Sequence, residues 1–231
     1  MSESSVPRSE YEQRWRKAQE AARERGLDGL VVWSRGGATV DSYADVLYLS
    51  NHYSQFPLVN DMVPHWAGRS HSALVIPLDR EPTLVVDIPD WRRDLVAVDD
   101  VRFSLDLPGT VAAVVLELAL GKSRLGLVGG NAMLVSPYRL LLSALRSAEL
   151  DPADDLVEAL RVHKSPRELE LISRHVKIPL AVAGGITPSD LPKIMAYRPA
   201  VVIVGRYILR ARDPALAARE VKDGLAELAK G

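Results

Sequence analysis

Two glycine turns near the end of the chain hold the residues best suited to bind a small anion. Gly184-Gly185 follows an apolar stretch at 178–183, and Gly205-Arg206 follows a second apolar stretch at 200–204. Glycine lets backbone N–H groups approach a phosphate closely, a following helix N-terminus adds partial positive charge, and arginine adds a charged fork. The sequence therefore predicts a phosphate site at Gly184, Gly185, Gly205 and Arg206. Tight turns between strands and helices are the purely structural alternative.

A second group of polar side chains lies in and beside the segment 52–70, which is rich in Pro, Asn, His and Trp and shows little periodicity. Long irregular segments of this kind are often functional. The candidate metal or substrate ligands are His52, Asp61, His65 and His71, but their spacing fits no standard metal motif such as HExxH, which favours polar loop residues. We therefore expect no metal, and a substrate or interface loop with His65, Trp66, Arg69 and His71.

Three other short patterns lack a residue that the motif they resemble requires. Gly121-Lys122-Ser123 resembles the end of a phosphate loop, but that motif needs a glycine where Leu116 stands. The glycines at 126–130 do not form GxGxxG and indicate a turn after a strand. Ser70 and Ser72 are not part of a GxSxG nucleophile elbow.

The composition limits the class of protein. The chain has 231 residues, of which 47% are hydrophobic and 26% are charged, as in globular proteins of one or two domains. Its 29 Lys and Arg nearly balance 30 Asp and Glu, so no strong field favours nucleic acid. Without cysteine it has no disulfide, thiolate metal site or cysteine nucleophile. The apolar run 111–120 is shorter than the roughly 20 residues of a membrane span, and we expect a cytoplasmic protein.

Strands and helices must position these residues. Sequence patterns in the first three quarters of the chain predict elements of both kinds. Ser9 and Glu12 form the pattern of a capping box, so we expect a helix from Glu10 to about Arg25 that Gly26 ends. The other expected elements are strands at 30–33, 46–49 and 124–128, a hairpin of 73–77 with 83–87, a buried helix at 111–120, a helix at 137–147 that begins with Pro137, and a helix start at 165–168.

The last quarter has a different pattern. A strand at 178–183 precedes a helix that Thr187 caps and Pro188 opens. A second strand at 200–204 precedes an amphipathic helix that begins at Asp213-Pro214. Short loops between such elements are typical of parallel α/β sheets. We expect these strands either to join the edge of the N-terminal sheet or to pack as a small βαβα appendage.

Three stretches of the first part carry a family resemblance: GLDGLVV at 26–32, ADVLYLS at 44–50 and LRVHKSPRELELI at 160–172. They resemble the N-terminal domain of the creatinase/prolidase/aminopeptidase P group of metallopeptidases. The resemblance implies a mixed-sheet domain at about 10–173 that helps dimerisation and shapes the substrate entrance. It also implies that the two-metal site, made of two Asp, one His and two Glu, lies beyond the last stretch. The residues after 173 do not resemble that catalytic domain, so no metal ligand is carried over.

Three later stretches resemble another family: VKIPLAVAGGI at 176–186, VVIVGR at 201–206 and ARDP at 211–214. They are similar to the end of a ribulose-phosphate-binding (β/α)8 barrel of the hexulose-6-phosphate synthase, ketogulonate-6-phosphate decarboxylase and orotidine-phosphate decarboxylase group. The resemblance implies the seventh and eighth strands with their phosphate-binding loops. The family's catalytic Asp-x-Lys-x-x-Asp is absent from this chain, and two strands cannot close a barrel.

Together these resemblances give an α/β chain with a disordered N-terminus at 1–9, a creatinase-type mixed-sheet domain at 10–173 and a βαβα fragment at 174–231 that resembles the last quarter of a barrel. We expect a catalytically incomplete fusion with a binding or oligomerisation role. We expect a homodimer, a sugar phosphate or inorganic phosphate as ligand, no cofactor, and no nucleic-acid or membrane partner. Two enzymatic alternatives remain: a hexulose-6-phosphate synthase-like lyase or decarboxylase, with a site assembled with another chain, and a relative of Xaa-Pro metallopeptidases.

Overall fold

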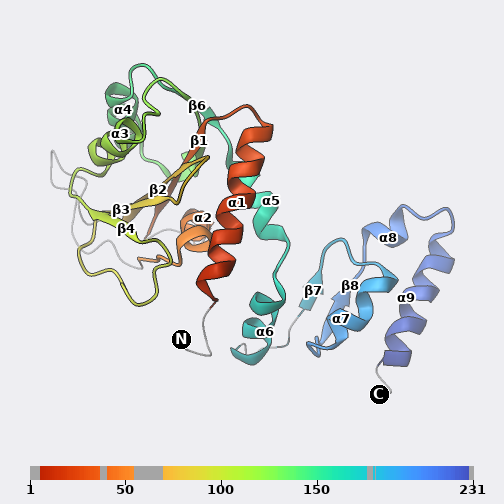
Figure 1. The fold of residues 1–231 in the computed structure, drawn as a ribbon. Helices are drawn as coiled ribbons and strands as arrows, with labels where there is room; N and C mark the ends of the chain where they lie inside the picture. The colour runs from red at the N-terminus through yellow and green to blue at the C-terminus, as the bar shows by residue number, and fades with distance from the viewer. Residues whose placement is uncertain (1–5, 37–40, 55–69, 176–178, 180, 229–231) are drawn as a thin grey trace. The chain divides into compact units, whose positions relative to one another are not determined.

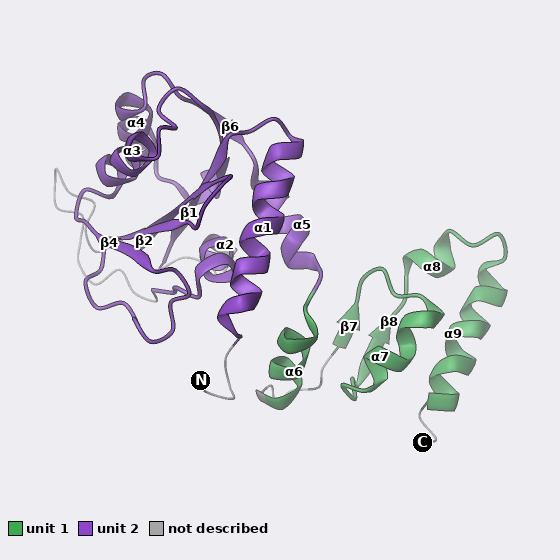
Figure 2. Ribbon diagram, viewed as in Figure 1, with its two compact units in different colours: residues 1–5, 164–231 green, residues 6–163 purple. Residues whose placement is uncertain are grey.

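The structure is a computed structural model that describes residues 6–36, 41–54, 70–175, 179 and 181–228. The chain forms two compact units (Figure 2). The larger unit spans residues 6–163, and the smaller is built mainly from 164–231. The units divide earlier in the sequence than the expected domain boundary at 173/174, because the helix that begins at Pro166 groups with the smaller unit.

A six-stranded mixed sheet forms the centre of the larger unit, in the order β4-β3-β2-β1-β5-β6. Its strands are β1 (Gly29–Arg35), β2 (His71–Pro77), β3 (Thr83–Val86), β4 (Asp100–Phe103), β5 (Arg124–Val128) and β6 (Glu149–Pro152). β2 runs antiparallel to both β1 and β3, whereas the pairs β1–β5, β5–β6 and β3–β4 are parallel. The expected mixed sheet, the hairpin and the strand at 124–128 are confirmed.

Helices cover both faces of this sheet (Figure 1). One face packs against α1 (Arg8–Glu24), α2 (Asp41–Ser50) and α5 (Asp154–Val162), and the other against α3 (Leu107–Glu117) and α4 (Val135–Ala144). Side chains alternate between the faces of a strand. Leu30 and Val32 of β1 therefore join the first core, and Val31 and Trp33 join the second. The sheet is the middle of three layers.

Two side chains of α1 close the end of α2. The Trp15 indole N–H donates to the Leu49 carbonyl at 2.6 Å, and the Arg14 guanidinium donates to the Tyr48 carbonyl at 2.7 Å. The last carbonyls of a helix have no partner within it. These two bonds satisfy such carbonyls away from water, since both Arg14 and Trp15 are buried.

The prediction of a strand at 46–49 is wrong, because these residues belong to the helix α2. A run of four apolar residues fits either a strand or a buried helix. The three buried side chains Tyr43, Val46 and Leu49 are three residues apart, which is helical spacing.

Two expected helix starts also need correction. α1 begins at Arg8 after Pro7, so Ser9 lies inside the helix rather than in a disordered N-terminus, and the Glu12 carboxylate accepts a hydrogen bond from Arg8 instead of closing a capping box. α4 begins at Val135 and ends at Ala144, so Pro137 is its third residue rather than its first. Proline is tolerated there because the first N–H groups of a helix have no helical acceptor.

The smaller unit contains a two-stranded parallel sheet of its own. Its elements are α6 (Pro166–His175), β7 (Ala181–Ala183), the 3₁₀ turn η2 (Pro188–Asp190), α7 (Leu191–Met195), β8 (Val201–Ile203), α8 (Arg206–Leu209) and α9 (Pro214–Leu228). β7 pairs with β8 and, among the described residues, not with the six-stranded sheet. The expectation of an added edge strand is therefore wrong, and that of a separate βαβα appendage is confirmed.

Capping residues begin two segments of this unit as expected. Ser165 and Glu168 exchange side-chain to backbone hydrogen bonds of 2.8 and 3.0 Å at the start of α6. Thr187 and Asp190 form the corresponding capping box at η2. None of the helices in the described parts of the chain is both long and apolar enough to span a membrane.

The tight turn after β5 yields a stability prediction. Gly129 has φ +78°, and a Cβ there would lie 2.0 Å from the Trp33 carbonyl oxygen. At Gly130 the nearest atom to a Cβ is Leu127 Cδ2, at 3.5 Å. We expect Gly129→Ala to lower the free energy of unfolding by about 2–5 kcal/mol through backbone strain and overpacking. The matched variant Gly130→Ala should change it by about 1 kcal/mol or less. Equal losses in urea unfolding would contradict this account of the turn.

Candidate functional site

The loops that follow β7 and β8 line one cavity of about 410 Å³ in the smaller unit. Its walls are formed by Gly185, Thr187, Arg206, Tyr207, Arg210 and Ala211. The structure thus brings two of the four predicted phosphate-binding residues, Gly185 and Arg206, to a common space. Gly184 and Gly205 are their chain neighbours and do not line the cavity.

The paired glycines serve the turn conformation. Gly184 has φ +100° and Gly185 has φ +60°, both in the left-handed region that favours glycine. A Cβ at either position would meet no atom within 4 Å, and the same holds at Gly205. The space beside these turns is therefore open.

Positive charge at this cavity comes from two arginines. Arg206 and Arg210 are exposed, one helical turn apart, and neither forms an ion pair within the described part of the chain. Two guanidinium groups on one small cavity suit an anion that accepts several hydrogen bonds. The expected contribution of a helix N-terminus is small here, because α8 has only four residues.

The other polar side chains around the cavity are engaged within the protein. The Thr187 hydroxyl donates to the Asp190 carboxylate at 2.6 Å, and the hydrogen bonds from Thr187 hold the pKa of Asp190 below its usual value. The Tyr207 hydroxyl donates to Glu220 at 2.6 Å. The sequence patterns did not lead us to Arg210, although its position four residues after Arg206 in a helical stretch was a usable signal.

The histidine group divides between described and undescribed residues. Asp61, His65, Trp66 and Arg69 lie outside the described residues. His71 lies in β2 rather than in a loop, is only 2% exposed, and its Nδ1 accepts a hydrogen bond of 3.1 Å from the Trp33 indole. In the parts of the chain that the structure describes, no three or more His, Asp or Glu side chains are grouped to hold a metal ion.

A buried carboxyl group beside His71 was not predicted. Asp87 is 3% exposed, and its Oδ2 accepts a hydrogen bond of 2.9 Å from the backbone N–H of His71. Its Oδ1 has no hydrogen-bond partner among the described residues. Burial raises the pKa of Asp87 to about 7. Burial also lowers the pKa of His52 to about 4. Burial thus favours the neutral form of both groups, because it penalises the charged form.

A family model and several solved structures match the chain. The model described as the creatinase/prolidase N-terminal domain matches residues 14–163. No curated protein sequence matches the chain. The N-terminal domain of the cytoplasmic peptidase PepQ from Mycobacterium tuberculosis H37Rv is 20% identical, with a TM-score of 0.43, over 64% of this chain and 98% of that one.

Longer proteins match over most of the present chain. An X-Pro aminopeptidase from Thermotoga maritima MSB8 is 16% identical with a TM-score of 0.50, and the match covers 90% of this chain and 48% of that one. A dipeptidase PepE from Mycobacterium ulcerans is 20% identical with a TM-score of 0.48, and the match covers 97% of this chain and 51% of that one. The chain thus spans about half the length of these two proteins.

The two buried titratable groups predict opposite pH dependences of stability. Folded Asp87 keeps its proton up to a pH of about 7, whereas the unfolded carboxyl loses it near its ordinary pKa of 3.8. The folded state therefore binds more protons between these values, and Asp87 lowers the free energy of unfolding as the pH rises. Folded His52 stays neutral down to about pH 4, against 6.5 when unfolded, so it raises that free energy as the pH rises from 4 to 6.5.

Single variants separate these opposing effects. In Asp87→Asn the free energy of unfolding should rise, relative to the parent protein, by up to about 4 kcal/mol between pH 4 and 7. In His52→Gln it should fall, relative to the parent, by up to about 3 kcal/mol between pH 4 and 6.5. Urea unfolding across this range measures both, with the exposed Asp90→Asn as the control for a lost charge. Variant curves parallel to the parent curve would show that neither group titrates as described.

Proposed function

Because the chain belongs to the creatinase/prolidase N-terminal domain family, we propose that residues 6–163 are a non-catalytic domain and that the chain binds a phosphate-bearing ligand through residues 164–231. The observation that carries the binding role is the pair Arg206 and Arg210 on one cavity with the glycine turn after β7. The proposed phosphate site thus lies in the smaller unit, outside the domain that the family model matches.

The chemistry-bearing groups of the larger unit support a structural role for it. His71 is bonded to Trp33, and its backbone N–H is bonded to Asp87, inside the sheet. The buried arginine Arg14 binds Glu10 at 2.6 Å and the end of α2. These contacts hold strands and helices of the larger unit together. The resemblance to the metallopeptidase group also implies that the family's metal ligands lie beyond the matched domain, which supports this proposal.

The cavity of the smaller unit suits a phosphate monoester or free phosphate. A volume of about 410 Å³ accommodates a small sugar phosphate. The guanidinium of Arg206 and that of Arg210 can each donate two hydrogen bonds to phosphate oxygens, and such charge-assisted bonds are strong. The backbone at Gly185 faces the same space without a side chain in the way.

Binding is favoured over the lyase alternative. Decarboxylase or lyase chemistry needs a group that takes or gives a proton beside the bound sugar. The described lining of the cavity offers only arginines, a tyrosine and a threonine, and both hydroxyls are already hydrogen-bonded. The family's Asp-x-Lys-x-x-Asp is also missing from the sequence. An Xaa-Pro peptidase activity would likewise need metal ligands from outside the described residues.

The two arginines give the binding prediction. We expect ribulose 5-phosphate and inorganic phosphate to bind, with ribulose 5-phosphate at about 100 times its dissociation constant stabilising the smaller unit by roughly 2.7 kcal/mol. Arg206→Ala and Arg210→Ala should each weaken binding about tenfold or more, because each removes charge-assisted hydrogen bonds. Calorimetric titration measures the dissociation constants.

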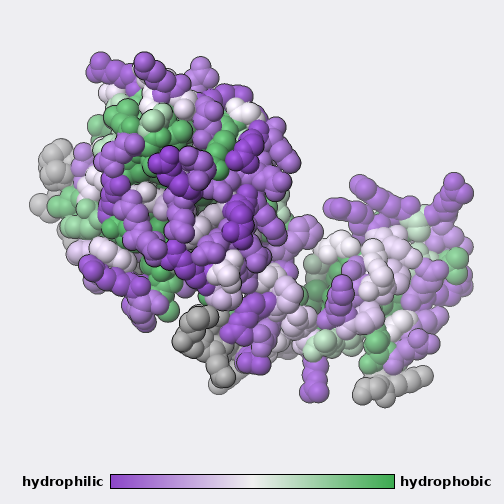
Figure 3. Space-filling view, in the orientation of Figure 1, coloured by the Kyte–Doolittle hydropathy of each residue, from purple (hydrophilic) through white to green (hydrophobic). Residues whose placement is uncertain are grey.

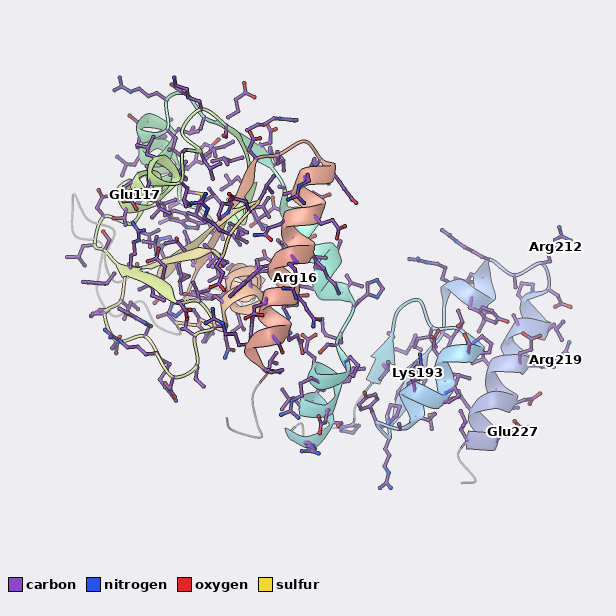
Figure 4. All side chains as sticks on the ribbon, in the orientation of Figure 1. Arg16, Glu117, Lys193, Arg212, Arg219 and Glu227 are labelled. Atoms are coloured by element: carbon purple, nitrogen blue, oxygen red, sulfur yellow. The ribbon has the colours of Figure 1, made fainter. Side chains whose placement is uncertain are left out.

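A matched control distinguishes this site from general charge. Arg212 is exposed on the turn between α8 and α9 and does not line the cavity (Figure 4). Arg212→Ala should leave binding within about twofold, because its charge is screened by solvent. Failure of the parent protein to bind either phosphate, or an equal loss in all three variants, would exclude the proposed role.

Self-association is a second candidate function, supported by the small sheet. Parallel sheets are ordinarily covered on both faces. Here Val201 is 49% exposed and Ile203 is 54% exposed, on the same side of β8. Figure 3 shows apolar residues at the surface in this part of the smaller unit. We propose that a second copy of the chain covers this face, which makes the protein a homodimer.

Light scattering after size exclusion tests this assembly. We expect a dimer for the parent protein and a monomer for Ile203→Lys, since a charge on the apolar face disfavours its burial. The control is Leu209→Lys, because Leu209 is 81% exposed but lies in α8. This variant should remain dimeric. A parent protein that is monomeric at high concentration would refute the proposed assembly.

A further inference from the structure

The larger unit has a cavity that the proposed function does not use. It measures about 390 Å³ and lies beyond the ends of the parallel strands β5 and β6. Leu127 and Pro152, at these strand ends, line it, together with Met133, Tyr138 and Asp154 from the segments that follow. Open α/β sheets commonly bind ligands beyond the carboxyl ends of parallel strands. The volume is within the range of small-molecule sites.

A hydrogen bond across the strand ends fixes the acidic wall of this cavity. The backbone N–H of Gly129 donates to Asp154 Oδ1 at 2.8 Å. Gly129 follows β5 directly, and Asp154 is the first residue of α5. The left-handed turn at Gly129, packed against the Trp33 carbonyl, therefore holds the Asp154 carboxylate at the cavity.

The charge around the cavity is negative. Asp154 is half-buried and has no ion pair within the described residues, and no Lys, Arg or His side chain lines the cavity. Two arginines of the same unit pair with other carboxylates, since Arg161 binds Asp45 at 2.8 Å and Arg25 binds Asp155. Burial is the main cause of the raised pKa of Asp45, and the charges of Glu158 and Asp154 add to it.

The remaining walls are apolar and aromatic. Leu127, Met133, Leu134 and Pro152 offer aliphatic or thioether surface, and Tyr138 offers an aromatic ring. An apolar lining with one carboxylate discriminates by both size and charge. An aromatic ring beside a carboxylate also attracts a cation through its π face.

We propose that this cavity binds an organic cation, namely a primary ammonium group that carries an aliphatic or aromatic substituent. The ammonium group pairs with the Asp154 carboxylate, and the substituent packs against Leu127, Met133 and Pro152. An anion of the same size is excluded by the unpaired negative charge. This site does not depend on the phosphate site, which lies in the other unit.

Three probes of nearly equal size test the charge preference. They are 2-phenylethylamine, the neutral 2-phenylethanol and the anionic 3-phenylpropionate, titrated into the full chain and followed by amide chemical shifts. We expect the amine to bind with shifts at residues 127–138 and 152–154, and at least about tenfold more tightly than the alcohol. We expect no binding of the acid. Equal binding of all three probes, preference for the acid, or shifts elsewhere would overturn the proposal.

A pair of neighbouring aspartates provides the matched variants. Asp154→Asn keeps a side-chain oxygen that accepts the Gly129 N–H and removes only the charge, so it should weaken amine binding about tenfold. Asp155→Asn removes the same charge one residue on, from a side chain that does not line the cavity, and should leave affinity within about twofold. Equal effects of the two variants would contradict the site.

A third variant tests the cavity without changing the hydrogen bond between Gly129 and Asp154. Val135 lines the cavity and is 66% exposed, so Val135→Trp adds volume at the rim without disturbing a core. This variant should abolish amine binding while the urea midpoint stays unchanged. Retained binding in Val135→Trp would place the amine elsewhere.

Discussion

The larger unit depends on the burial of β1 on both of its faces. Leu30, Val31, Val32 and Trp33 are each at most 1% exposed. β2 pairs along one edge of this strand and β5 along the other, so both rows of its backbone hydrogen bonds are used. A shift of one residue would exchange the two faces and place Trp33 in the core that now holds Val32. The register of β1 therefore fixes which helices can pack on which side.

The same constraint shapes the turn after β5. Gly126 sits where a Cβ would press on Leu30 and Ala153, and Gly129 passes close to the Trp33 carbonyl. Both positions require glycine because β5 pairs directly with β1, and the space beside each glycine is already filled by other atoms. In this close turn the backbone N–H of Gly129 donates to the Asp154 carboxylate. Packing in the core therefore positions a carboxylate near the surface. The position of Asp154 at this cavity thus depends on the turn that packs against β1.

Sequence patterns predicted the elements whose signals are local. The hairpin of β2 and β3, the strand β5 and the capped start of α6 follow from alternation and capping residues, whereas the four apolar residues within α2 do not distinguish strand from helix. The shared cavity of the two late glycine turns depends on how β7 and β8 pair. Asp87 and Asp154 look like ordinary surface aspartates in the sequence. Only the tertiary structure encloses the Oδ1 of Asp87 and joins Asp154 to Gly129, 25 positions away, because such long-range pairing leaves no periodic signal.

The two units differ in how many buried apolar residues stabilise them. The larger unit has two extensive cores, whereas the buried apolar residues described in 164–231 are Ile186, Leu191, Ala217 and Val221. A two-stranded parallel sheet is marginal alone, since a parallel pair usually needs cover on both faces. Any ligand or second copy that binds only the ordered form stabilises it by mass action. Phosphate binding at the loops after β7 and β8 and burial of the exposed face of β8 would act on the same small unit, so each strengthens the other through linkage.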